Sequence, residues 1–283
     1  MTIAVIIARG GSKRLPRKNV KLFCGHPLVS WAITQAFCSE LIDEVWLSTD
    51  DDELENIGLN YGANVIRRPD WPDADLAAAN RPFIHAIKYL KELYGDEFDT
   101  VVTILPTTPL IKPGELDEAI RKYKEYGCDK LRNLIPQRES VIFKKIHPYR
   151  AKLKIFDKRY NYLYQATSWG VTSPEGYLSW TQSIPDDDKT LDQIACSEDP
   201  YESECYFIPA EVWQGLDVDT QEEFELAELL MEYYILKGKG MNVYHEYKEE
   251  WENRKREISN KEKESEEEQI INNALNKYGV KLE

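Results

Sequence analysis

The sequence predicts an α/β fold in which a mostly parallel sheet is covered by helices on both faces. Three observations support this class. The chain begins with the short apolar run Ile3–Ala8, strand-like and helix-like segments then alternate, and a polar or glycine-containing turn follows each expected strand. An apolar run this short is typical of a strand buried on both faces, since a membrane span needs about 20 residues. Repeated βα units imply parallel strands joined by crossover helices.

The expected elements follow in a regular order. A turn is expected over residues 21–28, and Pro27 within it favours the start of a helix. Helices are expected over residues 28–38, 53–61, 80–93 and 113–126, with a last one ending near residue 236. Strands are expected over residues 3–8, 44–47, 63–66, 100–105 and 205–208. Ligands bind beyond the carboxyl ends of such strands, so the turns at Gly10, Ser48–Asp52 and Pro106–Pro109 are predicted to form one site.

Residues 133–207 break this alternation. The segments Val141–Ile146, Lys152–Phe156 and Tyr160–Tyr164 are rich in Tyr, Lys and Ile and indicate a small β-rich insertion, a candidate dimerisation arm. An acidic loop is expected over Pro185–Tyr201. We therefore predict a main domain over residues 1–244, which includes the insertion, and a charged, solvated and partly disordered helical tail over residues 245–283.

Composition narrows the class of protein. The chain has 283 residues, of which 42% are hydrophobic, enough for one large α/β domain or a core with an appendage. Its net charge of −14 argues against general nucleic-acid binding. No membrane span or secretory signal is visible, so we expect a cytoplasmic protein with no membrane partner. The 5 cysteines show no C-x-x-C spacing, which favours free thiols in a reducing compartment.

The turn after the first strand is the strongest functional signal. Gly10 and Gly11 are expected to turn the backbone with positive φ and to bring its N–H groups close to a ligand. Several cations surround these glycines: Arg9, Lys13, Arg14, Arg17 and Lys18. In an acidic protein this local positive charge predicts an anionic partner, best a polyphosphate, although a basic surface loop would share the composition. The G-x-x-x-x-G-K-[ST] and G-x-G-x-x-G patterns are both absent.

Residues 8–19 read A-R-G-G-S-K-R-L-P-R-K-N. This segment resembles the opening of the acylneuraminate cytidylyltransferase family (CMP-sialic acid synthetases), which activate sialic acid and related 3-deoxy-2-ulosonic acids. The resemblance implies a Rossmann-like three-layer nucleotidyltransferase fold and a homodimer in which the insertion pairs the subunits. It also implies CTP-dependent transfer that yields a CMP-activated acidic sugar, sialic acid or a related nonulosonate, and pyrophosphate.

The same resemblance assigns roles in the loop. Arg9 and Lys13 would be catalytic, stabilising charge as pyrophosphate departs. The implied nucleotide-binding residues are Ala8, Arg9, Gly10, Gly11, Ser12, Lys13, Lys18, Asn19 and Arg68. For Arg14 and Arg17, a solvated surface charge is as good an explanation as a contact with phosphate. An S-T-D-D segment ending at Asp51 also matches the family, although helix capping would explain its two aspartates as well.

A pair of acids is the candidate metal site. Asp217 and Asp219 are two residues apart, so on an extended segment they point to one face, and two carboxylates there suit Mg²⁺ or Mn²⁺. Helix capping is the alternative, because Thr220 and Glu223 form a T-x-x-E capping box and an aspartate just before it also favours the positive end of the helix that follows. The resemblance favours the metal and a catalytic role, since the family carries a D-x-D-T element here. The 4 histidines are scattered without ligand spacing.

The acceptor half departs from the family. Leu105 stands where the family has glutamine, and the segment from Gln165 to Gly170 lacks the family's arginine and asparagine. Gln165, Tyr206 and Phe207 are the candidate acceptor-binding residues, although core packing would explain the two aromatics equally well. The sequence therefore leaves three possibilities: a sialic acid or related nonulosonate acceptor, a Kdo or phosphonate acceptor, and a nucleotide-binding module without turnover.

Overall fold

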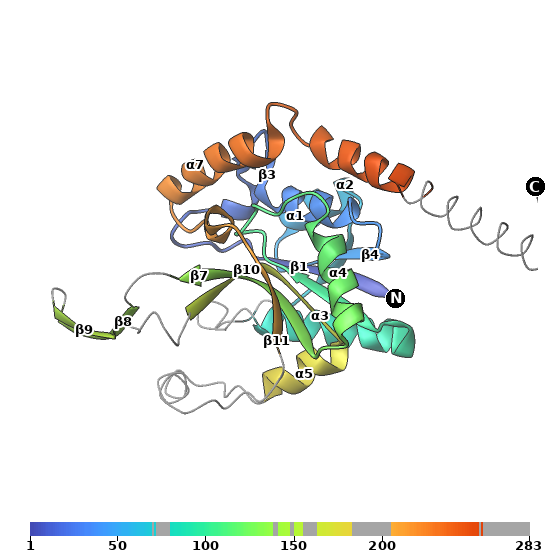
Figure 1. Ribbon diagram of the computed structural model, residues 1–283, viewed down its shortest axis with the longest axis horizontal. Helices are drawn as coiled ribbons and strands as arrows, with labels where there is room; N and C mark the ends of the chain where they lie inside the picture. Colours follow the sequence, from blue (N-terminus) through green and yellow to red (C-terminus); the bar gives the residue numbers. More distant parts are fainter. Residues whose placement is uncertain are drawn as a thin grey trace, which may run out of the picture.

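A computed structural model describes residues 1–69, 71, 80–137, 141–147, 150–154, 163–182, 205–254 and 256. Its centre is a seven-stranded sheet in the order β11-β7-β10-β6-β1-β4-β5 (Figure 1). Its strands are β1 (Thr2–Ala8), β4 (Glu44–Thr49), β5 (Asn64–Arg67), β6 (Thr100–Ile104), β7 (Lys130–Gln137), β10 (Leu163–Thr172) and β11 (Cys205–Pro209). Only β10 runs against its neighbours β6 and β7. The predicted fold class, α/β with a mostly parallel sheet, is confirmed.

Helices cover both faces of the sheet. Alternate residues of β1 serve opposite faces, as the pleat of a strand requires. Ala4 and Ile6 pack on the side of α1 (Leu28–Phe37), α2 (Asp52–Asn60) and α4 (Glu115–Tyr126). Ile3 and Val5 pack on the side of α3 (Asn80–Tyr94) and α5 (Pro174–Gln182). The three layers account for the uninterrupted apolar character of β1.

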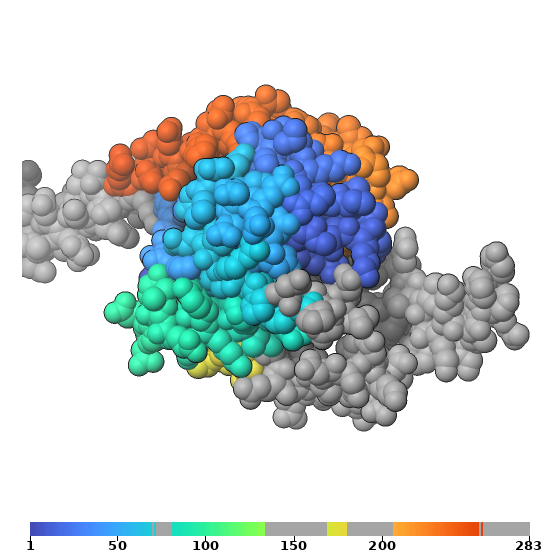
Figure 2. Space-filling model, turned by 180° about the vertical axis from the view of Figure 1, so that it is seen from behind, coloured from blue at the N-terminus to red at the C-terminus, as the bar shows by residue number. Residues whose placement is uncertain are grey.

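A further hydrophobic cluster joins a segment near the N-terminus to a segment about 200 residues later in the chain. It is built by α7 (Gln221–Leu230), the π-helix η4 (Met231–Leu236) and the short hairpin β2 (Leu22–Phe23)–β3 (His26–Pro27), which forms where a turn was predicted. Phe23 meets Phe224 edge to face at 5.4 Å, and Trp31 Nε1 donates to the Phe23 carbonyl at 2.7 Å. The dark-blue N-terminal segment accordingly lies beside the orange C-terminal segment in Figure 2.

The region expected as an insertion is divided between two sheets. Its strands β10 and β11 belong to the main sheet, together with most of β7, whereas β8 (Val141–His147) and β9 (Arg150–Lys154) form a separate hairpin. Because β10 pairs antiparallel with β6, the βα alternation stops in this region although the chain is still part of the main sheet. The expected strand Tyr160–Tyr164 is described only from Leu163, and the loop Pro185–Tyr201 lies outside the described residues. The division into domains stays a prediction.

The start of the predicted tail is helical over residues 242–254 and packs on the domain. Tyr244 is buried, donating to the Ile111 carbonyl at 2.8 Å and accepting from Gln35 Nε2 at 3.0 Å. The guanidinium of Arg121 lies 4.4 Å from the ring centre of Trp251. The predicted boundary at residue 244 therefore falls within a packed helix.

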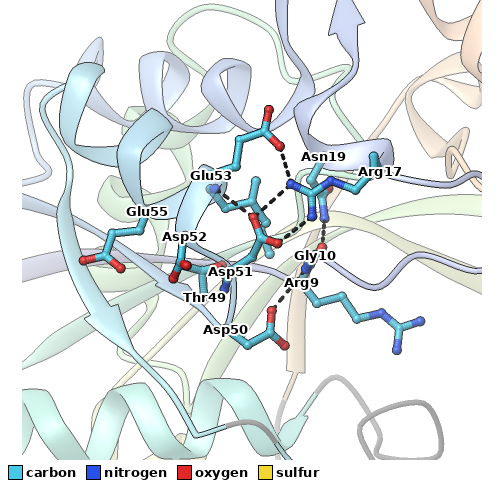
Figure 3. A network of polar contacts seen from close by, with 12 residues as sticks. Arg9, Gly10, Arg17, Asn19, Thr49, Asp50, Asp51, Asp52, Glu53 and Glu55 are labelled. Atoms are coloured by element: carbon cyan, nitrogen blue, oxygen red, sulfur yellow. Dashed lines mark hydrogen bonds and ion pairs between the residues drawn. The ribbon is translucent and has the colours of Figure 1, made fainter.

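The loop after β1 differs from the expectation for its glycines. Neither Gly10 nor Gly11 has positive φ, so that prediction was wrong; the left-handed residue of the loop is Arg17, at φ 56°. Gly10 is needed for another reason, because a Cβ there would lie 2.2 Å from Asp51 Oδ2. Arg17 holds Asp51 against Gly10, and Gly10 N donates to Asp50 Oδ1 at 3.1 Å (Figure 3).

Gly10→Ala tests this close approach. The added methyl group must displace the Arg17–Asp51 pair, so the free energy of unfolding should fall by about 1–3 kcal/mol in urea titrations. Gly11→Ala is the matched control, since a Cβ there meets nothing within 4 Å, and should stay within about 0.5 kcal/mol. Equal losses in both variants would contradict the explanation.

Tyr244→Phe tests the docking of the C-terminal helix. The change removes the hydroxyl from two hydrogen bonds and leaves the Ile111 carbonyl buried without its donor, so unfolding should become easier by about 1–3 kcal/mol. Tyr233→Phe is the control, because Tyr233 is 74% exposed. Thermal unfolding followed by circular dichroism should show a lower Tm only for Tyr244→Phe; an unchanged Tm would refute the role of this hydroxyl.

Candidate functional site

A cavity of about 340 Å³ opens at the carboxyl ends of β1, β4 and β6. Parallel strands bring their following turns to this edge, as the sequence predicted. The predicted residues in its wall are Ala8, Arg9, Ser12, Lys13, Lys18, Asn19, Arg68, Asp217 and Asp219. Gly10 and Gly11 are outside the wall. The structure thus brings most of the predicted nucleotide loop and the distant acid pair to one cavity.

The cations of the loop separate into two groups. Arg9 and Lys13 line the cavity, and Figure 3 shows the Arg9 side chain extending away from the Arg17–Asp51 pair. Arg17 is outside the cavity wall, bound to Asp51 and Glu53. Its guanidinium holds the pKa of Asp51 below its usual range, and Asp51 caps α2 by accepting from Leu54 N at 3.0 Å. The capping alternative is therefore confirmed for Asp51.

Lys18 connects the loop to the acid pair. Only 6% of the residue is exposed, and its ammonium donates to the Val218 carbonyl and, at 2.9 Å, to Asp219 Oδ1. Arg14 NH2 lies 2.7 Å from the other carboxylate oxygen, Asp219 Oδ2. Asp219 is thus paired with two cations of the same loop.

The backbone around Asp217 and Asp219 is also held by hydrogen bonds that do not involve their carboxylates. Val218 N donates to the Thr107 carbonyl at 2.7 Å, which ties the segment to the turn after β6. Thr220 and Glu223 form the complete capping box of α7. The predicted capping box is therefore confirmed, and its hydrogen bonds are made by the side chains of Thr220 and Glu223 and not by the carboxylates of Asp217 and Asp219.

The environment of Asp217 suits a cation. Surrounding protein displaces water and raises its pKa, the charge of Asp219 acts in the same direction, and a Thr107 hydrogen bond opposes them. Within the described part of the chain no three His, Cys, Asp or Glu side chains form a complete metal site. Mg²⁺ in nucleotide enzymes commonly takes one or two carboxylates and completes its shell with phosphate and water. Asp217 and Asp219 fit that donor set.

Arg68 has a structural task that the sequence did not reveal. It is 5% exposed, and its NH2 donates to the Ala8 carbonyl at 3.1 Å and to Asp50 Oδ2 at 3.0 Å. Its NH1 donates to the Ser48 carbonyl at 3.3 Å, so the side chain joins the ends of β1 and β4. Its Nε has no hydrogen-bond partner among the described residues, and neither has the buried Oδ1 of Asn19.

Trp71 is a cavity residue that sequence reasoning missed. Its ring centre lies 6.0 Å from the Arg68 guanidinium and 4.5 Å from that of Arg81. Cations within about 6 Å of an indole centre are attracted to its face. In the sequence, the one indication of this role was the position of Trp71, two residues after the Arg68-Pro69 pair.

Of the three predicted acceptor residues, the two aromatics with described side chains, Tyr206 and Phe207, do not line this cavity. Gln165 pairs with Ile135 and lies beyond the Trp169–Ile104 pair, so its backbone is at the carboxyl edge; its side chain is outside the described residues. Tyr206 and Phe207 are on the outermost strand, β11, each 42% exposed. Tyr206 stacks on Tyr126 with ring centres 5.2 Å apart. The cavity therefore gives no support to an acceptor role for these two aromatics.

Known proteins resemble this chain in both sequence and fold. The cytidylyltransferase family model matches residues 3–248. N-acylneuraminate cytidylyltransferase A of Danio rerio is 33% identical over 132 residues, which are 47% of this chain and 30% of that protein. Pseudaminic acid cytidylyltransferase of Campylobacter jejuni subsp. jejuni serotype O:2 is 38% identical over 123 residues, 43% of this chain and 52% of that protein. Each match spans less than two thirds of the relative.

A solved structure has the same fold. A CMP:2-keto-3-deoxy-manno-octonic acid synthetase complexed with CTP superposes with a TM-score of 0.60 at 17% identity, covering 81% of this chain and 98% of that one. No helix in the described ranges is long and apolar enough to cross a membrane. With the family match covering most of the chain, the resemblance seen in the loop is confirmed: the protein belongs to the cytidylyltransferase family.

Proposed function

We propose that the protein is a CTP-dependent cytidylyltransferase that forms a CMP-activated acidic sugar and pyrophosphate. One observation carries the proposal: the cations Arg9 and Lys13 and the carboxylates of Asp217 and Asp219 line a single cavity. Nucleotidyl transfer needs both groups, because the triphosphate must be held by donors and its charge reduced at the reacting phosphorus. The family match supports the choice of CTP.

In the proposed reaction the acceptor hydroxyl attacks the α-phosphorus of CTP, its proton passes to solvent, and pyrophosphate leaves. Arg9, Ser12 and Lys13 bind the triphosphate, and the two cations stabilise the charge that builds on pyrophosphate. Asp217 and Asp219 hold Mg²⁺ or Mn²⁺, which when bound neutralises phosphate charge. Asn19 and Arg68, which line the same cavity, lie near the nucleotide.

The acceptor proposed is a sialic acid or related nonulosonate. The relatives named for N-acylneuraminate and pseudaminic acid support it, whereas Leu105 in the cavity wall departs from the family pattern. Kdo or a phosphonate is the second candidate. We also propose a cytoplasmic homodimer, on the basis of the family resemblance.

Activity assays test the proposed reaction directly. The protein with CTP and Mg²⁺ should release pyrophosphate only when an acidic sugar is added, because the acceptor supplies the nucleophile. The acceptors to compare are N-acetylneuraminate, pseudaminate, Kdo and a phosphonate, with UTP and EDTA as controls. CTP binding without turnover on any acceptor would instead favour a nucleotide-binding module.

Asp217→Asn tests the metal assignment. Loss of one anionic ligand should lower kcat/KM by about 10²–10³-fold and weaken Mn²⁺ binding measured calorimetrically with CTP present. Glu222→Gln is the matched control, because this exposed acid in the first turn of α7 is outside the cavity wall. Similar kcat/KM values for Asp217→Asn and Glu222→Gln would contradict the assignment.

A further inference from the structure

The two cations on Asp219 are held very differently. The Lys18 side chain is 7% exposed and also donates to the Val218 carbonyl, so it is fixed within the protein. The Arg14 side chain is 72% exposed, and its ion pair with Asp219 Oδ2 is 2.7 Å long on the solvent side. Exposed ion pairs contribute little to stability. Arg14 can therefore leave Asp219 at small cost, whereas Lys18 cannot.

A divalent cation at Asp219 would compete with Arg14. The Asp219 carboxylate is already paired on both oxygens, and a metal brought near it would also be repelled by the guanidinium. Arg14 lines the same cavity as Arg9 and Lys13, within the loop assigned to the triphosphate. A guanidinium binds phosphate oxygens as well as it binds carboxylate oxygens. Arg14 thus has two alternative anionic partners at one site.

We propose that Arg14 is a positioning residue that couples metal binding to nucleotide binding. In the free protein it occupies Asp219 Oδ2 and disfavours the metal. When CTP binds, its phosphate oxygens accept hydrogen bonds from the Arg14 guanidinium in place of Asp219. Asp219 Oδ2 then becomes available to the metal. This inference rests on the proposed function. It predicts that metal binds weakly alone and that CTP and metal each strengthen the binding of the other.

The test compares Arg14→Gln with Lys21→Gln. Lys21 belongs to the same segment and contacts α7 through Gln221, so its replacement removes one charge without touching Asp219. Calorimetric titration with Mn²⁺ alone should show roughly fivefold tighter binding for Arg14→Gln than for the wild type. Titration with CTP in saturating Mg²⁺ should show roughly fivefold weaker binding for the same variant. Lys21→Gln should change neither by more than about twofold.

The opposite signs of the two shifts distinguish coupling from a structural role. Arg14→Lys, which keeps a positive charge, should restore most of both wild-type affinities. Equal Mn²⁺ affinity in wild type and Arg14→Gln would overturn the inference, as would tighter Mn²⁺ binding with unchanged CTP affinity. Failure of the proposed function would appear separately, as wild-type protein that binds CTP and Mn²⁺ with these couplings but releases no pyrophosphate.

Discussion

The arrangement of the site depends on the buried ammonium of Lys18. A charge removed from water is costly unless it is paired and hydrogen-bonded. Lys18 meets this requirement by bonding to the Val218 carbonyl and to Asp219, which is 201 positions later in the chain. The same contacts that make its burial tolerable hold the acid segment against the loop. The position of the candidate metal carboxylates relative to the phosphate-binding cations is therefore set within the core of the protein.

The rest of the loop is shaped by two acids that follow β4: Asp51, outside the cavity wall, and Asp50, which is part of it. Asp51 caps α2 and binds Arg17, and the absence of a side chain at Gly10 lets that pair pack against the loop backbone. Asp50 receives Gly10 N and the Arg68 guanidinium. These pairings hold Arg17 outside the cavity wall, whereas Arg9 and Lys13 line the cavity. A loop that appears uniformly basic in sequence thus has distinct structural and ligand-facing cations.

Local patterns made the βα half of the fold predictable. Short apolar strands followed by polar turns identify β1, β4 and β6, and the turns converge because the strands are parallel. Lys18–Asp219 and Arg68–Asp50 were not predictable, since nothing in a sequence pairs such distant charges. The φ expected at Gly10 was wrong because glycine serves close approach as well as left-handed turns. The strand that carries Tyr206 was predicted, but its position at the edge of the sheet depends on the order of all the strands, which a single strand does not encode.

The nucleotide and acceptor sides of the cavity are built under different constraints. The phosphate side is made by turns after β1 and β6 and by the acid segment, all tied by buried hydrogen bonds. A triphosphate presents the same charge whatever the acceptor, so these ties suit any cytidylyl transfer. The wall also contains Leu105, which brings an apolar side chain, and Trp71, whose ring lies near the guanidinium of Arg68. Leu105 cannot form the hydrogen bonds of the amide that the family pattern places at this position, so under the proposed function the acceptor is recognised by other polar groups.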